Sequence, residues 1–245
     1  LQNNNLIETG IIKSSERVTT TKFRIIGNKA QMLRVDEETV KELSDSEFRR
    51  LYEKIENILE SNKISCVVFQ DYDKGVITKK LLDLLIPKLN ELNIPIAVDP
   101  KRKNFSYYKN VTLFKPNFKE LKEGMKIDIS LEKENELAQA VNELLEKQNI
   151  RIVMTTLSDK GVYMSCNSRD KGRLSALIPA HVRMVADVSG AGDTVIGTAA
   201  LCLSLGMKAY DIAYISNLAG GMVCEYIGVV PVDKERLLKE LKQSL

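Results

Sequence analysis

Short apolar segments alternate with amphipathic helical segments through the middle of this chain. The apolar segments span 64–69, 94–98, 111–114 and 151–155, and residues with helical periodicity separate them at 78–92 and 132–148. Strands joined through helices pair in parallel, and a parallel sheet has to be covered on both faces. The alternation therefore predicts an α/β fold of three layers, with a mainly parallel sheet between two layers of helices.

The two ends of the chain add elements to this prediction. Residues 18–36 alternate apolar and polar side chains around Gly27 and Asn28, which is typical of a β-hairpin. Ser44 and Glu47 form a capping-box pattern, which predicts the start of a helix. Further on, 163–167 predicts an antiparallel strand, and closing helices are predicted at 192–205, 209–226 and 233–244. We expect one domain over 1–245, with a small β flap near 18–36.

Composition excludes several classes of protein. The net charge of +3 carries no long block of like charge, so we expect neither a nucleic-acid nor a membrane partner. The apolar runs are shorter than the roughly 20 residues that cross a bilayer, and no signal peptide is visible. A single histidine, His181, excludes metal sites built from several histidines. Cys66, Cys166, Cys202 and Cys224 are scattered among apolar residues and predict small core side chains in a reducing compartment, the cytoplasm.

Polar clusters follow four of the predicted strands at their carboxyl ends. The clusters are residues 71–75, 99–102, 115–117 and 155–158. One cluster alone is more often a solvated loop, but open α/β sheets bind ligands outside the carboxyl ends of their strands. The four together predict a binding site along one edge of the sheet.

The sequence DVSGAGDT at 187–194 directly precedes an apolar helical segment. The small residues Gly190, Ala191 and Gly192 let several backbone N–H groups point at one spot, where the helix dipole adds positive charge. Such a turn suits the phosphates of a nucleotide and a phosphoryl group in transfer. Asp193 could cap the helix, or it could accept a proton from a substrate hydroxyl.

This complete D-x-[ST]-G-A-G-D string resembles the signature of the ribokinase-like (PfkB) carbohydrate kinases. The resemblance implies a ribokinase-like fold, ATP and Mg²⁺ as cofactors, and a monovalent cation as a further candidate. It makes Asp193 the base, assisted by the amides of Gly190, Ala191, Gly192 and Asp193 itself. The segment KPNFKE at 115–120 resembles the family's N-P-N-x-x-E segment, which implies that Asn117 and Glu120 organise Mg²⁺ and phosphates, mainly through water.

The resemblance extends over nearly the whole chain. It implies that one strand and turn line the nucleotide pocket and that Asn217 lies near the adenine. The residues of that strand and turn are Thr155, Thr156, Ser158 and Gly161. Two segments depart from the family pattern: Lys115 replaces an Asn or Thr, and 228–230 differs at the expected cation loop.

Within the family, the string at 20–37 together with DYDKG and IPIAVDPK is most similar to the D-glycero-β-D-manno-heptose 7-phosphate kinases. These enzymes phosphorylate an anomeric hydroxyl and often form one half of a bifunctional protein that makes ADP-heptose for lipopolysaccharide. The similarity implies that four residues bind the sugar: Arg34, Asp36, Asp71 and Lys101. For Tyr72 and Phe105 we expect core packing rather than stacking on a ligand.

Alternatives from other classes remain open at this point. The chain could phosphorylate another sugar or a nucleoside, or it could be a non-catalytic remnant that binds nucleotide or sugar. A dinucleotide-binding domain is excluded because no G-x-G-x-x-G follows the first predicted strand. We expect a homodimer. Since residue 1 is Leu and the family's first strand and Gly-Gly motif are not seen, we also expect the natural protein to extend upstream.

Overall fold

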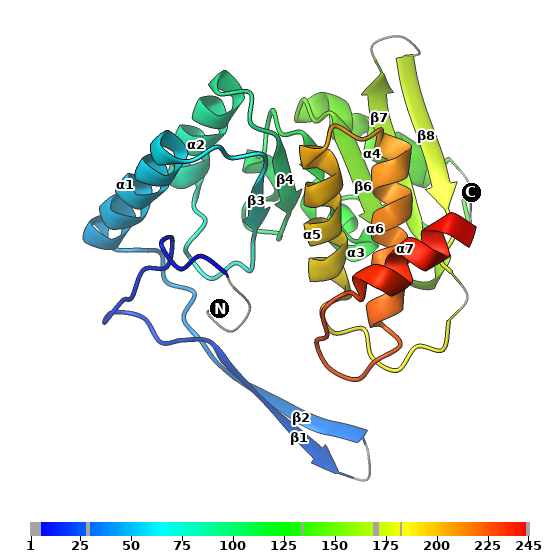
Figure 1. Cartoon of the computed structure of the whole chain (residues 1–245), viewed down its shortest axis with the longest axis horizontal. Helices are drawn as coiled ribbons and strands as arrows, with labels where there is room; N and C mark the ends of the chain where they lie inside the picture. Colours follow the sequence, from blue (N-terminus) through cyan, green and yellow to red (C-terminus); the bar gives the residue numbers. More distant parts are fainter. Residues whose placement is uncertain (1–5, 28–29, 134, 169–171, 182, 244–245) are drawn as a thin grey trace. The chain divides into compact units, whose positions relative to one another are not determined.

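The computed structural model describes residues 6–27, 30–133, 135–168, 172–181 and 183–243 (Figure 1). The chain divides into two compact units. The first consists of Leu1–Ile64 and Asp73–Leu81, and the second of Ser65–Tyr72 and Leu82–Leu245.

The first unit contains the predicted flap and one long helix. Strands β1 (Thr21–Gly27) and β2 (Ala30–Glu37) pair antiparallel, which confirms the hairpin, although Asn28 lies outside the described residues. Helix α1 (Asp45–Ser61) begins at the predicted place, because Ser44 and Glu47 form both hydrogen bonds of a capping box. These local signals suffice to place both elements.

The second unit is built on a sheet. Its strands are ordered β3 (Val67–Gln70), β4 (Ile96–Asp99), β5 (Leu113–Phe114), β6 (Ile152–Thr156), β7 (Val162–Ser168) and β8 (Gly172–Ile178). The strands from β3 to β6 run parallel, and β7 and β8 extend the sheet antiparallel at one edge. This arrangement confirms the mainly parallel sheet, the antiparallel excursion and the convergence of four strand ends on one edge.

Helices cover both faces of this sheet (Figure 1). On one face, α5 (Ala191–Ser204) packs against β3 and β4, and α6 (Ala209–Val223) packs against β7 and β8. On the other face lie α3 (Phe118–Met125) and α4 (Glu136–Lys147), which pack against β6. From Leu82 onward, α2 (Lys79–Glu91) also belongs to this unit, and α7 (Lys234–Gln243) packs against α6. The sequence did not predict α3, whereas the other helices lie where they were expected.

The main core lies between the sheet and the pair α5 and α6. Its fully buried side chains include Ala97, Leu113, Met154, Ala199 and Ala213. Helices α5 and α6 approach closely, since a Cβ on Gly220 would lie only 2.5 Å from Cγ2 of Val195. The mainly apolar, small-residue composition of both helices allows this contact.

The aromatic and cysteine predictions have mixed outcomes. Phe105 is buried and makes an edge contact with Phe114, which confirms core packing, but Tyr72 is 51% exposed, so its core assignment was wrong. All the cysteines are free thiols; Cys166 and Cys202 are buried, and Cys66 and Cys224 are half-buried. Burial raises the pKa of the Cys66 thiol to about 11. In the described part of the chain, no helix is long and apolar enough to cross a bilayer.

Candidate active site

The turn before α5 is shaped by a glycine in the left-handed region. Gly190 is the N-cap residue with φ of 80°, and the helical bonding starts with the amide of Thr194 donating to its carbonyl at 2.9 Å. Among the described residues, none accepts a hydrogen bond from the amides of Gly192 and Asp193, whereas the amide of Ala191 donates to the carbonyl of Val188 at 3.3 Å. The turn therefore offers unpaired N–H groups to an anion at the positive end of the helix.

Asp187 holds this turn in place. Its carboxylate accepts hydrogen bonds from the amide and hydroxyl of Ser189 at 3.0 and 2.9 Å, and from the amide of Gly228 at 2.9 Å. The hydrogen bond from Gly228, followed by the bonds from Ser189, lowers the pKa of the Asp187 carboxyl. Asp187 thus ties the start of the signature to the segment after α6, which is a structural role.

Asp193 lies in the first turn of α5, and its carboxylate does not cap the helix. Its Oδ1 accepts a hydrogen bond from the Tyr72 hydroxyl at 2.7 Å and another from Nε2 of Gln70 at 3.0 Å. Burial, followed by the hydrogen bond to Asp193, raises the pKa of Tyr72 to about 12, so the phenol remains a donor. These contacts with Asp193 could not be predicted from the sequence, although Gln70 directly precedes the polar cluster at the end of β3 and Tyr72 lies within it.

A buried ion pair lies directly beside the turn. Nζ of Lys115 is 3.1 Å from Oδ1 of Asp99, and Gln70 donates to Oδ2 of Asp99 at 2.9 Å. Burial raises the pKa of Asp99, and the charge of Lys115 opposes this effect. A Cβ on Gly192 would lie 3.8 Å from Nζ of Lys115, so the lysine that departs from the family pattern is next to the anion turn. Its charge is matched by Asp99, which the sequence did not identify as its partner.

Asn117 and Glu120 serve as the capping box of α3. The amide of Asn117 donates to Oε2 of Glu120 and the amide of Glu120 donates to Oδ1 of Asn117, both at 2.8 Å. The other carboxylate oxygen of Glu120 pairs with Lys101. In the described chain no cluster of three or more His, Cys, Asp or Glu side chains could hold a metal. These residues therefore fit Mg²⁺ only as it is often bound, by substrate phosphates and through retained water.

The residues predicted to line the nucleotide pocket all lie in the second unit. Thr155 is fully buried, and the amide of Thr156 donates to the carbonyl of Pro116 at 3.1 Å. Ser158 and Gly161 form a tight turn with φ of 58° and 94°. Asn217 is on α6, where its amide donates to the carbonyl of Pro179 at 2.9 Å.

The residues predicted to bind sugar divide between the two units. Asp71 and Lys101 are in the second unit, together with Asp193; buried Asp71 accepts hydrogen bonds from Tyr108 at 2.7 Å and Asn104 at 2.9 Å. Arg34 and Asp36 are in the first unit, where they form an ion pair of 3.1 Å on the flap.

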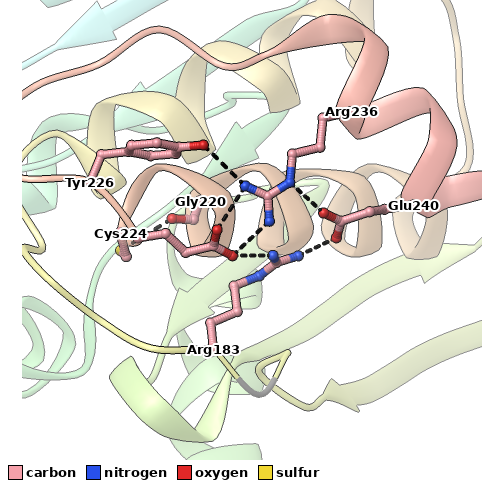
Figure 2. A network of polar contacts seen from close by, with 7 residues as sticks. Arg183, Gly220, Cys224, Tyr226, Arg236 and Glu240 are labelled. Atoms are coloured by element: carbon pink, nitrogen blue, oxygen red, sulfur yellow. Dashed lines mark hydrogen bonds and ion pairs between the residues drawn. The ribbon is translucent and has the colours of Figure 1, made fainter.

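A charged network that the sequence did not reveal joins the segment after α6, helix α7 and the segment before the signature (Figure 2). Arg183 pairs with Glu225 and Glu240, and Arg236 pairs with the same two carboxylates at 2.7 and 2.9 Å. The amides of Ala186 and Asp187 also donate to the carbonyl of Cys224. The network thus fixes the chain that leads into the Asp193 turn.

Comparison with known proteins identifies relatives and a shared fold. The chain is 33% identical to the bifunctional protein HldE of Koribacter versatilis over 97% of its own length and 47% of that protein. It is 37% identical to HldE of Campylobacter jejuni subsp. doylei, over 90% and 45% respectively. The chain thus spans about half the length of the curated relatives it matches.

Solved structures show the same fold at lower identity. Phosphofructokinase-2 from Escherichia coli in complex with potassium superposes with a TM-score of 0.71 at 18% identity, covering 84% of this chain and 65% of that one. Arabidopsis thaliana ribokinase complexed with ribose and ATP gives 0.67 at 17% identity, covering 92% and 70%. The fold is therefore ribokinase-like. Residues 1–235 match the pfkB family carbohydrate kinase profile. The chain belongs to the pfkB carbohydrate kinase family.

Proposed function

We propose that this protein transfers a phosphoryl group from ATP to a sugar hydroxyl, with Asp193 as the general base. The observation that carries the proposal is an exposed carboxylate beside unpaired amides at the start of α5. Asp193 accepts the proton of the attacking hydroxyl, and the amides of Gly192 and its neighbours stabilise the charge on the phosphoryl oxygens. Mg²⁺, when bound with ATP, neutralises charge on the β- and γ-phosphates.

We propose the other ligand contacts from the same geometry. Thr155, Thr156, Ser158, Gly161 and Asn217 line the nucleotide side, and Asn117 and Glu120 order water around Mg²⁺. A monovalent cation would be held near 228–230, where the amide of Gly228 is fixed by Asp187.

The proposed acceptor is the anomeric hydroxyl of heptose 7-phosphate, which would place the protein in the synthesis of ADP-heptose. Two observations support this choice. The relatives are bifunctional proteins of which this chain matches about half, as expected for a kinase half. Lys101 adds a cation at the end of β4, at the same edge of the sheet as Asp193, and ammonium groups favour phosphate oxygens. On the sugar side we also include Asp71 of the same unit.

The test is a panel of acceptors with ATP and Mg²⁺, in which ADP release is measured. Heptose 7-phosphate should give the highest kcat/KM, ahead of unphosphorylated heptose, ribose, fructose and adenosine. The Asp193→Asn variant gives the background rate of ADP release, which is the rate without the proposed base. Equal or better turnover of an unphosphorylated sugar would contradict the heptose assignment and leave a sugar kinase. If no acceptor exceeds the Asp193→Asn background, the kinase proposal itself is wrong.

We also propose that the protein is a homodimer. In the flap, Phe23 lies opposite Val35 and Ile25 lies opposite Leu33, so one face of the ribbon is apolar. These four side chains are each about half exposed, and a second copy could cover them. Light scattering of the wild type and of Phe23→Ser tests this; the wild type should be a dimer and the variant should dissociate more readily.

A further inference from the structure

We propose that Gln70 and Tyr72 are positioning residues that hold Asp193 by one carboxylate oxygen and leave the other to accept the substrate proton. This inference rests on the proposed function, in which Asp193 is the base. It assigns separate tasks to the two oxygens of the same carboxylate.

The two donors converge on one atom. The Tyr72 hydroxyl lies 2.7 Å from Oδ1 of Asp193, and Nε2 of Gln70 lies 3.0 Å from the same oxygen. Within the described part of the chain, no group donates to Oδ2. Two donors on one oxygen stop the carboxylate from rotating about its Cβ–Cγ bond, so Oδ2 is the free acceptor.

Gln70 is itself held in one orientation. Its Nε2 also donates to Oδ2 of Asp99 at 2.9 Å, so both amide hydrogens meet carboxylates. Flipping the amide would turn its oxygen toward two anionic acceptors. Asp99 is anchored in turn by Lys115 at 3.1 Å, and both side chains are almost completely buried. The chain of contacts from Lys115 through Asp99 and Gln70 therefore ends on Asp193.

Tyr72 supplies the second donor from an exposed position. It lies two residues beyond Gln70, which is the last residue of β3, so a single strand end carries both donors. Its high pKa, caused first by burial of the hydroxyl and then by Asp193, keeps the proton on the phenol at neutral pH. The donor therefore remains in place over the whole range in which a kinase of this kind would be assayed.

A competing assignment makes Tyr72 and Gln70 sugar contacts that touch Asp193 only while no sugar is bound. The two assignments differ in their effects. Loss of a positioning donor lowers kcat, because the base is misaligned in the transition state. Loss of a sugar contact raises KM for the sugar.

The experiment uses Tyr72→Phe and Gln70→Leu, each with a matched control. Tyr210→Phe removes the same hydroxyl from a residue that is also 51% exposed but lies on α6, and Gln139→Leu makes the same change on the exposed side of α4. The first readout needs no substrate: the ¹³C chemical shift of the Asp193 carboxyl at neutral pH, measured by NMR of aspartate-labelled protein and assigned with Asp193→Asn. A donated hydrogen bond polarises the carboxylate that accepts it, so this chemical shift should change in both variants and in neither control.

The second readout is steady-state kinetics with ATP and the best acceptor. Each variant should lose roughly tenfold in kcat with KM values little changed, because a hydrogen bond to a charged group has about this effect. The double variant Tyr72→Phe/Asp193→Asn should be no slower than Asp193→Asn alone, since the hydroxyl acts through the carboxylate.

Three outcomes would overturn the inference: an unchanged chemical shift of the Asp193 carboxyl, a raised sugar KM at constant kcat, or losses in kcat that multiply in the double variant. If Gln70→Leu does not fold, Tyr72→Phe alone decides, because it removes one exposed hydroxyl. Failure of the proposed function shows differently: the wild type then turns over no sugar, while the NMR chemical shift still decides whether the two donors hold Asp193.

Discussion

Lys115 and Asp99 form an ion pair of 3.1 Å in which solvent reaches only 3% of one side chain and 6% of the other. Removing one partner leaves the other charge buried, which typically costs about 3–5 kcal/mol of folding free energy. We therefore expect Lys115→Met to be strongly destabilised in urea unfolding monitored by circular dichroism.

The double variant Lys115→Met/Asp99→Asn is the matched control for this prediction. It removes both charges, and the amide at position 99 can still accept a hydrogen bond from Gln70, so much of the lost stability should return. If the double variant is less stable than Lys115→Met, the stability lost in the single variant does not come from leaving Asp99 as an unpaired buried charge.

Asp193→Asn should reduce kcat by about 10²–10⁴-fold, because the amide keeps the shape of the side chain but cannot accept a proton. ATP binding, measured by isothermal titration calorimetry, should be largely unchanged, since it depends on the backbone turn. A variant that keeps near wild-type kcat would mean that Asp193 is not the base.

Gly161→Ala should destabilise the protein more than Gly206→Ala. Both glycines have positive φ, 94° and 69°, so both substitutions carry a backbone cost of about 1 kcal/mol or more. At Gly161 a Cβ would also lie 2.0 Å from the carbonyl oxygen of Ile178, whereas at Gly206 nothing lies within 4 Å. Thermal unfolding of the two variants gives the comparison, and equal shifts in Tm would contradict it.

The Arg183 network should make stability sensitive to acid. Hydrogen bonding by Arg236, the largest favourable cause, and by Arg183 lowers the pKa of Glu225 from 4.5 to about 2. A carboxyl with a lowered pKa in the folded state stabilises the protein above its ordinary pKa and loses that contribution as pH falls from 4.5 toward 2.

Glu225→Gln should therefore be less stable than the wild type at neutral pH, and the difference in Tm should narrow as pH falls through that range. The exposed Glu143→Gln on α4 is the control and should follow the wild type. A Tm difference that stays constant down to pH 2 would contradict the assignment.

The elements that could be predicted from the sequence are those with local causes. The capping pair at Ser44 and Glu47, the alternation in the flap and the apolar strands each depend on residues close in the chain. Helix α3 was missed for a related reason: Asn117 and Glu120 were interpreted as metal-ordering residues, although the same spacing is a capping box.

Parts of the site depend on contacts between distant segments. The motif at 187–194 located Asp193, but the bonds from Gln70 and Tyr72 span more than 120 positions. Likewise, Arg183 meets Glu225 and Glu240 only because α6 and α7 pack together. No periodicity in the chain specifies such pairs; they follow from the parallel order of β3 and β4 and from helix packing.

The close contact between Gly220 and Val195 lets a residue on α6 affect the position of α5. A methyl group at position 220 would meet Val195 one turn after the start of α5, so the Val195 side chain or α5 itself would have to move. The absence of a side chain at position 220 is therefore part of what sets the spacing between α6 and α5, the helix that carries Asp193. A substitution that changes this spacing could therefore move Asp193 while every residue of the motif stays as it is.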